Sequence, residues 1–259
     1  MYSQKMAKFL ITGHKSGLGH YFYESFGGIG FDRTISSSKF ESFRSEGADV
    51  IIHCAFNSAR EINSKNLFQY ISDNVFLTKK LIKIPHKKFI YISSIDVYPK
   101  DNKKHAEDEV IDINQVSGIY AITKLMSESI VQNHSSNFLI LRCSSLLGHD
   151  VRENSLIKII KEKNPTVTLS VESVLNFVLH KNILEFINKA IKKDLKGIYN
   201  LVSSRNITSP QIAELLGKKV SFGTYTYNVG DVDNKKASKM LPGFKKTSSA
   251  VIKEFRASG

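Results

Sequence analysis

The chain has 259 residues, of which 41% are hydrophobic, enough to fill the core of one large domain or of one domain with a small appendage. Its formal net charge of +13 favours anionic partners, but the lysines are scattered and accompany no nucleic-acid motif, so nucleic-acid binding is only a weak alternative to a solvated basic surface. No apolar run approaches the ~18 residues of a membrane span and no signal-peptide pattern precedes the first apolar run, which argues against a membrane protein and predicts a cytoplasmic one.

The first predicted strand, Phe9 to Thr12, leads into three closely spaced glycines and then into a helix predicted over Leu18 to Phe26. Gly13 permits the tight turn, Gly17 lets a phosphate approach the backbone, and Gly19 lets the helix pack closely on the strand. We therefore predict that this turn binds the pyrophosphate of a dinucleotide. The residues assigned to the turn are Gly13, His14, Lys15, Ser16, Gly17, Leu18 and Gly19.

The second predicted strand, Thr34 to Ser36, is followed by only Ser36 to Asp49 before the next strand. That interval holds one short crossover helix but no further strand, so we expect one edge of the sheet to be trimmed. An acid at the end of the second strand holds the ribose 2′-hydroxyl of NAD, whereas a basic or hydroxyl-rich turn accepts the 2′-phosphate of NADP. We predict NADP in preference to NAD, from the side chains of Lys15, Arg33, Ser36, Ser37 and Lys39. The alternative is that Lys39 begins a solvated helix and Arg33 points outward.

The middle of the chain alternates apolar runs with helical stretches. The predicted strands are Val50–Ala55, Phe89–Ser93 and Phe138–Arg142, and the predicted helices are Asn74–Ile84 and Tyr120–Gln132. This alternation predicts a parallel sheet with helices on both faces, whose ligands bind at the carboxyl ends of the strands. Cys54 and Cys143 fall in apolar runs without metal-ligand spacing, so we expect buried thiols, no disulfide and no metal site.

After Gly148 the predicted elements become shorter. They are Asn154–Lys163, a strand at Thr166–Ser170, Asn176–His180 with a helix through Ile191, a strand at Gly197–Val202, and a helix at Gln211–Leu216 opened by Thr208-Ser209-Pro210. We predict a dinucleotide-binding domain over residues 1–148, to which residues 176–202 return. Residues 149–175 and 203–259 would form a small substrate-binding lid over the carboxyl edge of the sheet.

Tyr120 and Lys124 are four residues apart on a predicted helix and therefore share one face. A free phenol titrates near pH ~10, and a neighbouring ammonium stabilises the phenolate and lowers its pKa. The pair can therefore act as a proton donor near neutral pH. The alternative for the pair alone is a core tyrosine and a surface lysine on an amphipathic helix.

The glycine turn, Ser94 at the end of the fourth strand and Tyr120-x-x-x-Lys124 together resemble the extended branch of the short-chain dehydrogenase/reductase superfamily, the NAD(P)-dependent epimerases and dehydratases. The resemblance covers nearly the whole chain. It implies a Rossmann-like doubly wound parallel sheet with a small C-terminal lid. It also implies that Tyr120 is the acid-base group, that Lys124 binds the nicotinamide ribose, and that Ser94 hydrogen-bonds the substrate oxygen. Alone, Ser94 would be interpreted as a capping serine.

The same resemblance implies further contacts. Those with the cofactor are His53, Cys54, Ala55, Asn74, Cys143 and Ser145, and those with the substrate are Phe56, Asn57, Ser94, Asp96, Tyr98 and Ser144. Asp96 stands where dehydratases of the branch have Glu, and the alternative for it is a turn or surface carboxylate. Leu175 and Asn182 stand where sugar-nucleotide enzymes of the branch have Arg and Asp, so one diphosphate contact is expected to be missing. Pro99 replaces a usual Gly, so the loop after Tyr98 is expected to differ from that of the family.

The leading hypothesis is an NADP-dependent oxidoreductase that reduces a keto group on a nucleotide-linked or related sugar. The nearest alternative is an epimerase or dehydratase with tightly held NAD, and an alternative of another class is a non-catalytic NADP-binding sensor. The intact Ser94, Tyr120 and Lys124 favour catalysis. The resemblance also implies a homodimer formed through a four-helix interface.

Overall fold

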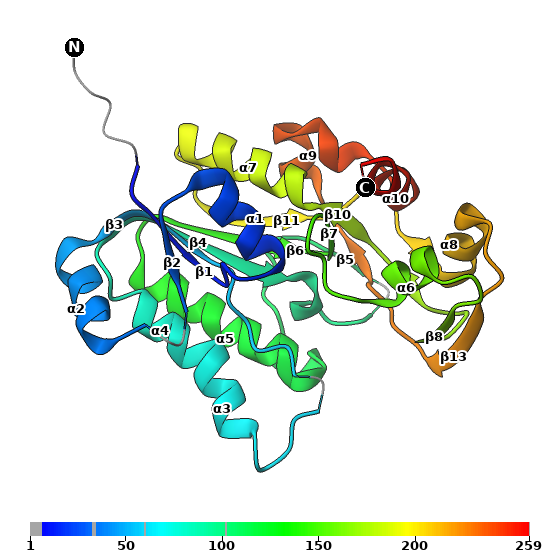
Figure 1. Ribbon diagram of the computed structural model, residues 1–259, viewed down its shortest axis with the longest axis horizontal. Helices are drawn as coiled ribbons and strands as arrows, with labels where there is room; N and C mark the ends of the chain where they lie inside the picture. Colours follow the sequence, from blue (N-terminus) through cyan, green and yellow to red (C-terminus); the bar gives the residue numbers. More distant parts are fainter. Residues whose placement is uncertain (1–6, 33–34, 60, 102, 259) are drawn as a thin grey trace.

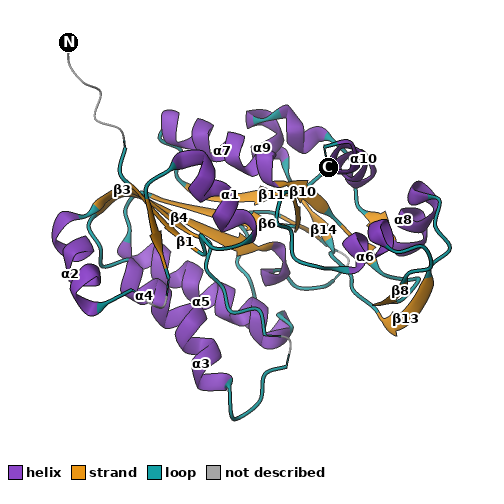
Figure 2. Cartoon of the chain, in the orientation of Figure 1, coloured by secondary structure: helices purple, strands orange, loops and turns teal. Residues whose placement is uncertain are grey.

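A parallel sheet organises the computed structural model, which describes residues 7–32, 35–59, 61–101 and 103–258. Within these residues the sheet has six strands in the order β11-β6-β4-β3-β1-β2 (Figure 1). The strands are β1 (Phe9–Thr12), β2 (Ile29–Phe31), β3 (Ala48–His53), β4 (His86–Ser94), β6 (Phe138–Cys143) and β11 (Gly197–Leu201). Parallel strands need helical crossovers, and Figure 2 shows helices on both faces. The predicted Rossmann-like architecture is therefore confirmed.

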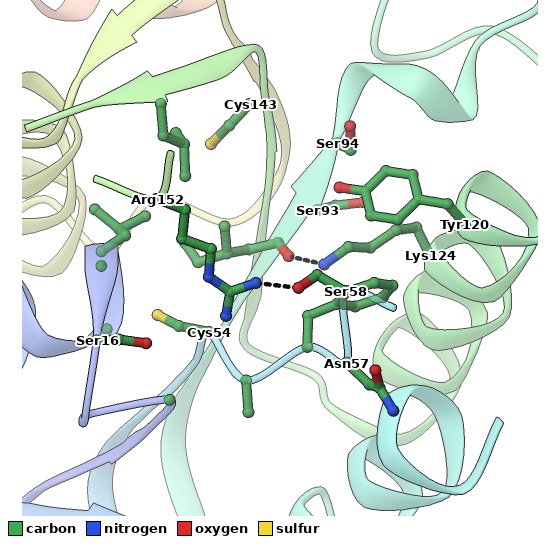
Figure 3. A pocket seen from close by; sticks show the side chains of 18 of the residues that line it. Ser16, Cys54, Asn57, Ser58, Ser93, Ser94, Tyr120, Lys124, Cys143 and Arg152 are labelled. Carbon is green, nitrogen blue, oxygen red and sulfur yellow. Dashed lines mark hydrogen bonds between the residues drawn. The ribbon is translucent and has the colours of Figure 1, made fainter. Parts of the chain in front are cut away.

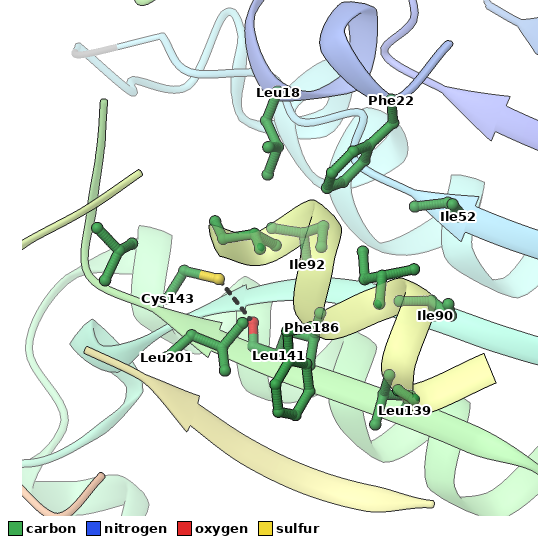
Figure 4. Packing of buried hydrophobic residues seen from close by; sticks show 14 of the residues in the cluster. Leu18, Phe22, Ile52, Ile90, Ile92, Leu139, Leu141, Cys143, Phe186 and Leu201 are labelled. Atoms are coloured by element: carbon green, nitrogen blue, oxygen red, sulfur yellow. Dashed lines mark hydrogen bonds between the residues drawn. The ribbon is translucent and has the colours of Figure 1, made fainter. Parts of the chain in front are cut away.

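Alternate residues of each strand enter one of two cores. Ile11, Ile52 and Ile90 pack against helices α1 (Gly17–Phe26) and α7 (His180–Lys192), where Phe22 and Phe186 are fully buried (Figure 4). Their neighbours in sequence, such as Leu10, Ile51 and Phe89, point to the opposite face. There they pack with side chains of helices α2 (Ser37–Glu46), α4 (Leu77–Leu81) and α5 (Gly118–His134). This double burial fixes the strands and therefore the loops at their carboxyl ends.

The second strand differs from the prediction, because β2 is Ile29–Phe31 and not Thr34–Ser36. Ser36 instead caps α2, since its side chain accepts a hydrogen bond from the Lys39 amide. Two glycines with positive φ end α1 and return the chain at once to the sheet, and a Cβ on the second, Gly28, would lie 2.6 Å from the Phe9 carbonyl oxygen. Helix α2 then leads to β3, on the far side of β1 from β2. The trimmed edge is confirmed, with β2 as the edge strand.

Two of the predicted helices agree with the structure and the third begins earlier. Helix α1 and helix α5 match their predicted ranges within about two residues at each end. The helix predicted from Asn74 is preceded by α3 (Leu67–Ile71) and begins within a π turn, Ser72–Phe76, that continues into α4. Asn74 therefore lies inside a longer helical segment and is buried there.

The chain after β6 forms short helices and pairs of strands. The strands are β7 (Ser145–Leu147), β8 (Thr166–Leu169), β9 (Val174–Leu175), β10 (Phe177–Leu179), β12 (Ile207–Thr208), β13 (Ser221–Tyr225) and β14 (Asp231–Val232), the last paired with β5 (Lys104–His105). The α-helices that follow α7 or precede it in this part are α6 (Ser155–Lys161), α8 (Ser209–Leu216), α9 (Lys235–Met240) and α10 (Ser248–Ala257), with a short 3-10 turn at Pro242–Lys245. Two further 3-10 turns, Ile95–Val97 and Ile113–Gln115, lie earlier in the chain, between β4 and α5. Apolar side chains between Leu147 and Phe255 form their own cluster. The predicted domain boundaries stay predictions.

None of the helices in the described part of the chain combines the length and apolar character needed to cross a membrane.

Candidate active site

A cleft of about 720 Å³ opens at the carboxyl ends of β1, β3, β4 and β6. Sixteen of the predicted site residues line it: Gly13, Ser16, Gly17, Leu18, Gly19, Cys54, Ala55, Phe56, Asn57, Ser94, Asp96, Tyr120, Lys124, Cys143, Ser144 and Ser145. The structure therefore brings the glycine turn, the strand ends and the Tyr-x-x-x-Lys helix to one place. The described residues His14, Lys15, Ser36, Ser37, Lys39, His53, Asn74 and Tyr98 lie outside the lining, and Arg33 is not among the described residues.

The glycine turn has the backbone that its sequence predicts. Gly13 and Gly17 adopt positive φ values of 72° and 58°, a region that disfavours side chains. A Cβ on Gly19 would lie 2.3 Å from the Gly13 carbonyl oxygen, so only glycine lets α1 pack here. Thr12 Oγ1 accepts hydrogen bonds from the amides of Cys54 and Ala55, which ties the turn to the end of β3. Helix α1 begins at Gly17 in the cleft wall, with the positive end of its dipole there.

Three residues that were expected to contact a cofactor have contacts within the protein and lie outside the cleft lining. His14 packs over Gly30 of β2, where a Cβ would lie 2.4 Å from its ring. His53 is buried between Thr12 Oγ1 (2.8 Å) and Thr78 Oγ1 (3.0 Å), and burial lowers its pKa to about 3, so it is neutral. Asn74 accepts a 2.6 Å hydrogen bond from the Asn57 amide and so holds the loop after β3.

An acid directly follows β2, the strand end at which dinucleotide-binding folds of this type contact the ribose 2′ position. Asp32 comes directly after Phe31, lines the cleft, and lies 2.5 Å from the ammonium of Lys15. Ser36, Ser37 and Lys39 are exposed in the first turn of α2. The NADP prediction assumed that the second strand ends at Ser36. Because β2 ends at Phe31, that assumption is wrong.

Ser94, Tyr120 and Lys124 line the same part of the cleft (Figure 3). Ser94 ends β4 and is buried, while α5 packs beside β4 and carries the other two. Lys124 Nζ donates a 2.8 Å hydrogen bond to the Ile92 carbonyl and lies 4.3 Å above the ring of Phe56. The ring of Phe56 also meets Tyr120 edge-on at 4.9 Å.

The electrostatics of this group set its proton chemistry. Burial lowers the pKa of Lys124 to about 8. Tyr120 keeps 37% of its surface exposed, yet burial in the cleft and the nearby Asp96 carboxylate raise its pKa above the ordinary value. A hydrogen bond with Ser94 opposes that rise. The ammonium of Lys124 lies 6.0 Å from the Tyr120 ring centroid, and its expected effect on the phenol stays a prediction.

A buried ion pair behind the cleft sets the spacing of β4 and α5. The guanidinium of Arg142, on β6, donates to both carboxylate oxygens of Glu128, on α5. Ser93, next to Ser94 in β4, donates a 2.5 Å hydrogen bond to the same carboxylate. Arg142 also donates to the hydroxyl of Tyr98, which is 1% exposed and faces this pair, outside the cleft lining. The pair holds α5 against the sheet, because separating the two partners would leave a buried charge uncompensated.

Several residues that line the cleft were not predicted from the sequence. They are Asp32, Ser58, Arg152, His180 and Tyr227, with others from the same loops. Tyr227 lies after β13, and its hydroxyl donates a 2.8 Å hydrogen bond to Asp96. Asp32 is an acid at a strand end, a pattern that can be recognised in a sequence. It was missed because the second strand was predicted at Thr34–Ser36, after Asp32. The other four lie in no recognisable motif, and only the folded chain brings them here.

The cleft fits a dinucleotide on three observations. A Cβ on Gly17 would meet only the Asp150 carbonyl oxygen, in ordinary van der Waals contact at 3.8 Å, so the backbone of the turn is not crowded. The glycine turn leads into the start of α1, where phosphates bind. Ser144 Oγ is buried in the cleft wall without a hydrogen-bond partner in the described structure, as expected of a donor that meets a ligand.

Comparison with known proteins gives one family match. The model of the NAD dependent epimerase/dehydratase family matches residues 10–201. Human dTDP-D-glucose 4,6-dehydratase is 25% identical over 188 residues, which cover 67% of this chain and 53% of the human protein. The protein of that name from Dictyostelium discoideum is 22% identical over 195 residues, 66% of this chain and 45% of its own. The chain spans about half the length of the curated relatives it matches.

Solved structures share the fold over nearly the whole chain. A dTDP-4-dehydrorhamnose reductase from Bacillus anthracis in complex with NADP has a TM-score of 0.79 and 17% identity, covering 98% of this chain and 99% of its own. A UDP-glucuronic acid 4-epimerase from Bacillus cereus in complex with UDP-glucuronic acid and NAD has a TM-score of 0.69 and 19% identity, covering 95% and 99%. At such identities the likeness concerns the fold.

Proposed function

The chain belongs to the NAD-dependent epimerase/dehydratase family of enzymes, and from this premise we propose that it is a dinucleotide-dependent oxidoreductase that reduces a keto group on a nucleotide-linked or related sugar. The observation that carries the proposal is the meeting of Ser94, Tyr120 and Lys124 with the glycine turn in one cleft. Relatives and structural neighbours named for nucleotide sugars support the substrate class.

In this reduction Ser94, Tyr120 and Lys124 have separate roles. A bound nicotinamide would supply the hydride. The hydroxyls of Ser94 and Tyr120 would both donate to the carbonyl oxygen, which becomes negative as the carbon is reduced. Tyr120 then gives its proton to that oxygen, and the ammonium of Lys124 stabilises the phenolate that remains. A lysine with a pKa of about 8 is largely protonated at neutral pH, so it can serve in this way.

We propose NAD as the preferred cofactor. Asp32 stands where a carboxylate accepts the ribose 2′-hydroxyl and repels a 2′-phosphate. Its contact with Lys15 supports this, because the pair fixes the carboxylate in the cleft wall. NADP is the alternative, in which Lys15 would leave Asp32 for the phosphate.

An epimerase or dehydratase is the second candidate, and Asp96 favours it. Its carboxylate lines the cleft beside Ser94 and is held by Tyr227 and Lys100. A carboxylate there can take a proton during elimination. The curated relatives that match are dehydratases, which supports the same candidate.

One experiment separates the candidates. Mass spectrometry of the denatured protein would identify any dinucleotide and nucleotide sugar that co-purify with it. A reductase should then consume added NADH in step with product. An epimerase or dehydratase should convert its substrate without net consumption and keep its dinucleotide through gel filtration. A dinucleotide that binds without turnover of any keto sugar would favour the sensor alternative.

We also propose a homodimer. Phe68 in α3, Phe76 in the π turn and Met126 in α5 expose 75%, 49% and 43% of their surfaces. Figure 1 shows α3 and α5 on the same side of the sheet. Large exposed apolar side chains gathered in this way are typical of protein interfaces. Sedimentation of the wild type and of a Phe68→Asp variant tests it, because the charge should shift a dimer toward monomer.

A further inference from the structure

Arg152 crosses the mouth of the cleft. Its Nη1 atom donates a hydrogen bond to Ser58 Oγ, which joins the loop after β7 to the loop after β3. Figure 3 shows the side chain pointing into the cleft, with Ser16 of the glycine turn on one side and Lys124 on the other. Both Arg152 and Ser58 line the cleft and both are exposed, so neither is locked by packing.

The loop that carries Arg152 lies over the glycine turn. The Asp150 carbonyl oxygen is 3.8 Å from the position of a Cβ on Gly17. The Asp150 carboxylate is 3.6 Å from His20 in α1. Arg152 lies two residues later in the same loop and lines the same cleft as Gly17 at the start of α1, the place that fits a phosphate group.

The positive charge of Arg152 indicates that it can bind an anionic group. Among the lysines and arginines of the described residues, Lys124 and Arg152 are the two that line the cleft. Lys124 is buried and bonded to the Ile92 carbonyl. Arg152 is bonded to a neutral hydroxyl, a weaker partner than a phosphate, which a guanidinium can hold with two parallel hydrogen bonds. A diphosphate in the cleft would therefore displace Ser58.

We propose that Arg152 is a diphosphate clamp that Ser58 holds back until a ligand enters. On binding, the guanidinium leaves Ser58 and takes two phosphate oxygens. The inference rests on the proposed function and deepens it. The diphosphate can belong to the dinucleotide or to a nucleotide-linked substrate, and both present the same chemistry to Arg152.

Binding measurements on Arg152→Gln and Ser58→Ala test the clamp. Each is compared with wild type and with Arg256→Gln, which loses the same charge on the exposed face of α10. The probes are NADH, ADP and UDP, with adenosine and uridine as partners that lack the diphosphate. We expect Arg152→Gln to weaken diphosphate binding about tenfold, chiefly by faster dissociation, and to leave the nucleosides unchanged. Ser58→Ala should speed association, since it frees the guanidinium.

The results show whether the diphosphate belongs to the cofactor or to the substrate. They also separate a failure of the clamp from a failure of the proposed function. Weaker binding of NADH and ADP assigns the clamp to the cofactor, and weaker binding of UDP alone assigns it to the substrate. Equal affinities of wild type and Arg152→Gln for all three diphosphates, with unchanged thermal melting, would overturn the clamp while leaving the proposed function intact. If wild type binds none of them, the proposed function fails and the clamp with it.

Discussion

Tyr227 donates a 2.8 Å hydrogen bond to Oδ1 of Asp96, although 131 positions separate the two residues. Lys100 Nζ lies 2.9 Å from the same oxygen, and Ser94 Oγ lies 3.3 Å from the other carboxylate oxygen. The loop after β13 therefore reaches the end of β4 and positions a carboxylate beside Ser94. The charge of that carboxylate is one reason why the pKa of Tyr120 is raised.

Replacing Asp96 should change the pH dependence of reduction. Activity should fall in two steps as the pH rises, first as Lys124, with a pKa of about 8, loses its ammonium charge, and then as Tyr120, which works in its protonated form, loses its proton. Asp96→Asn removes a negative charge, lowers the pKa of Tyr120, and should move the second alkaline limb of the kcat profile to lower pH. Tyr227→Phe keeps the carboxylate and serves as the control. A limb that stays in place or moves upward in Asp96→Asn would contradict the assignment.

Tyr120→Phe should abolish turnover and leave dinucleotide binding nearly unchanged. The variant lacks only the hydroxyl that donates the proton, so we expect kcat to fall by about 10²–10⁴. Steady-state kinetics and fluorescence titration with NADH measure the two quantities. Tyr225→Phe, on an exposed side chain, is the matched control. Activity like that of the wild type in Tyr120→Phe would remove the proposed mechanism.

Asp32→Ser should shift cofactor preference toward NADP. The serine can no longer repel a 2′-phosphate, and Lys15 is released from its partner to contact that phosphate. We expect the ratio of the dissociation constants for NADPH and NADH to fall about tenfold, the effect of one charge-assisted hydrogen bond. A wild-type protein that already binds NADPH more tightly would refute the NAD proposal.

Phe186→Ala should destabilise the fold. The side chain is fully buried between α7 and the sheet, so its loss leaves a cavity and costs about 3–5 kcal/mol of unfolding free energy. Urea denaturation measures the change. Tyr225→Ala removes an aromatic ring of similar size from a side chain that is 61% exposed and lies outside the proposed dimer face, and it should change the unfolding free energy far less. Comparable losses in both variants would contradict the assigned core.

The sequence predicts the central sheet well because its strands are apolar runs with helices between them. It misplaces the second strand because Ile29-Gly30-Phe31 is short and interrupted by glycine, and only pairing with β1 makes it a strand. The glycine turn and the Tyr-x-x-x-Lys pair are local patterns and can be recognised from the sequence alone. Arg152 and Tyr227 reach the cleft through tertiary packing, which no local pattern encodes.

The hydrogen bonds of Thr12 fix the direction of donation along a chain of buried side chains. Its oxygen already accepts two amide protons, from Cys54 and Ala55, so its own proton must go to His53 Nδ1. His53 is neutral and must then carry its proton on Nε2, facing Thr78, whose hydroxyl in turn faces the Asn74 carbonyl. The side-chain donors Thr12, His53 and Thr78 therefore point the same way, from the end of β1 into the helical layer. Thr12→Val would remove the donor to Nδ1 and leave the buried imidazole free to switch tautomer.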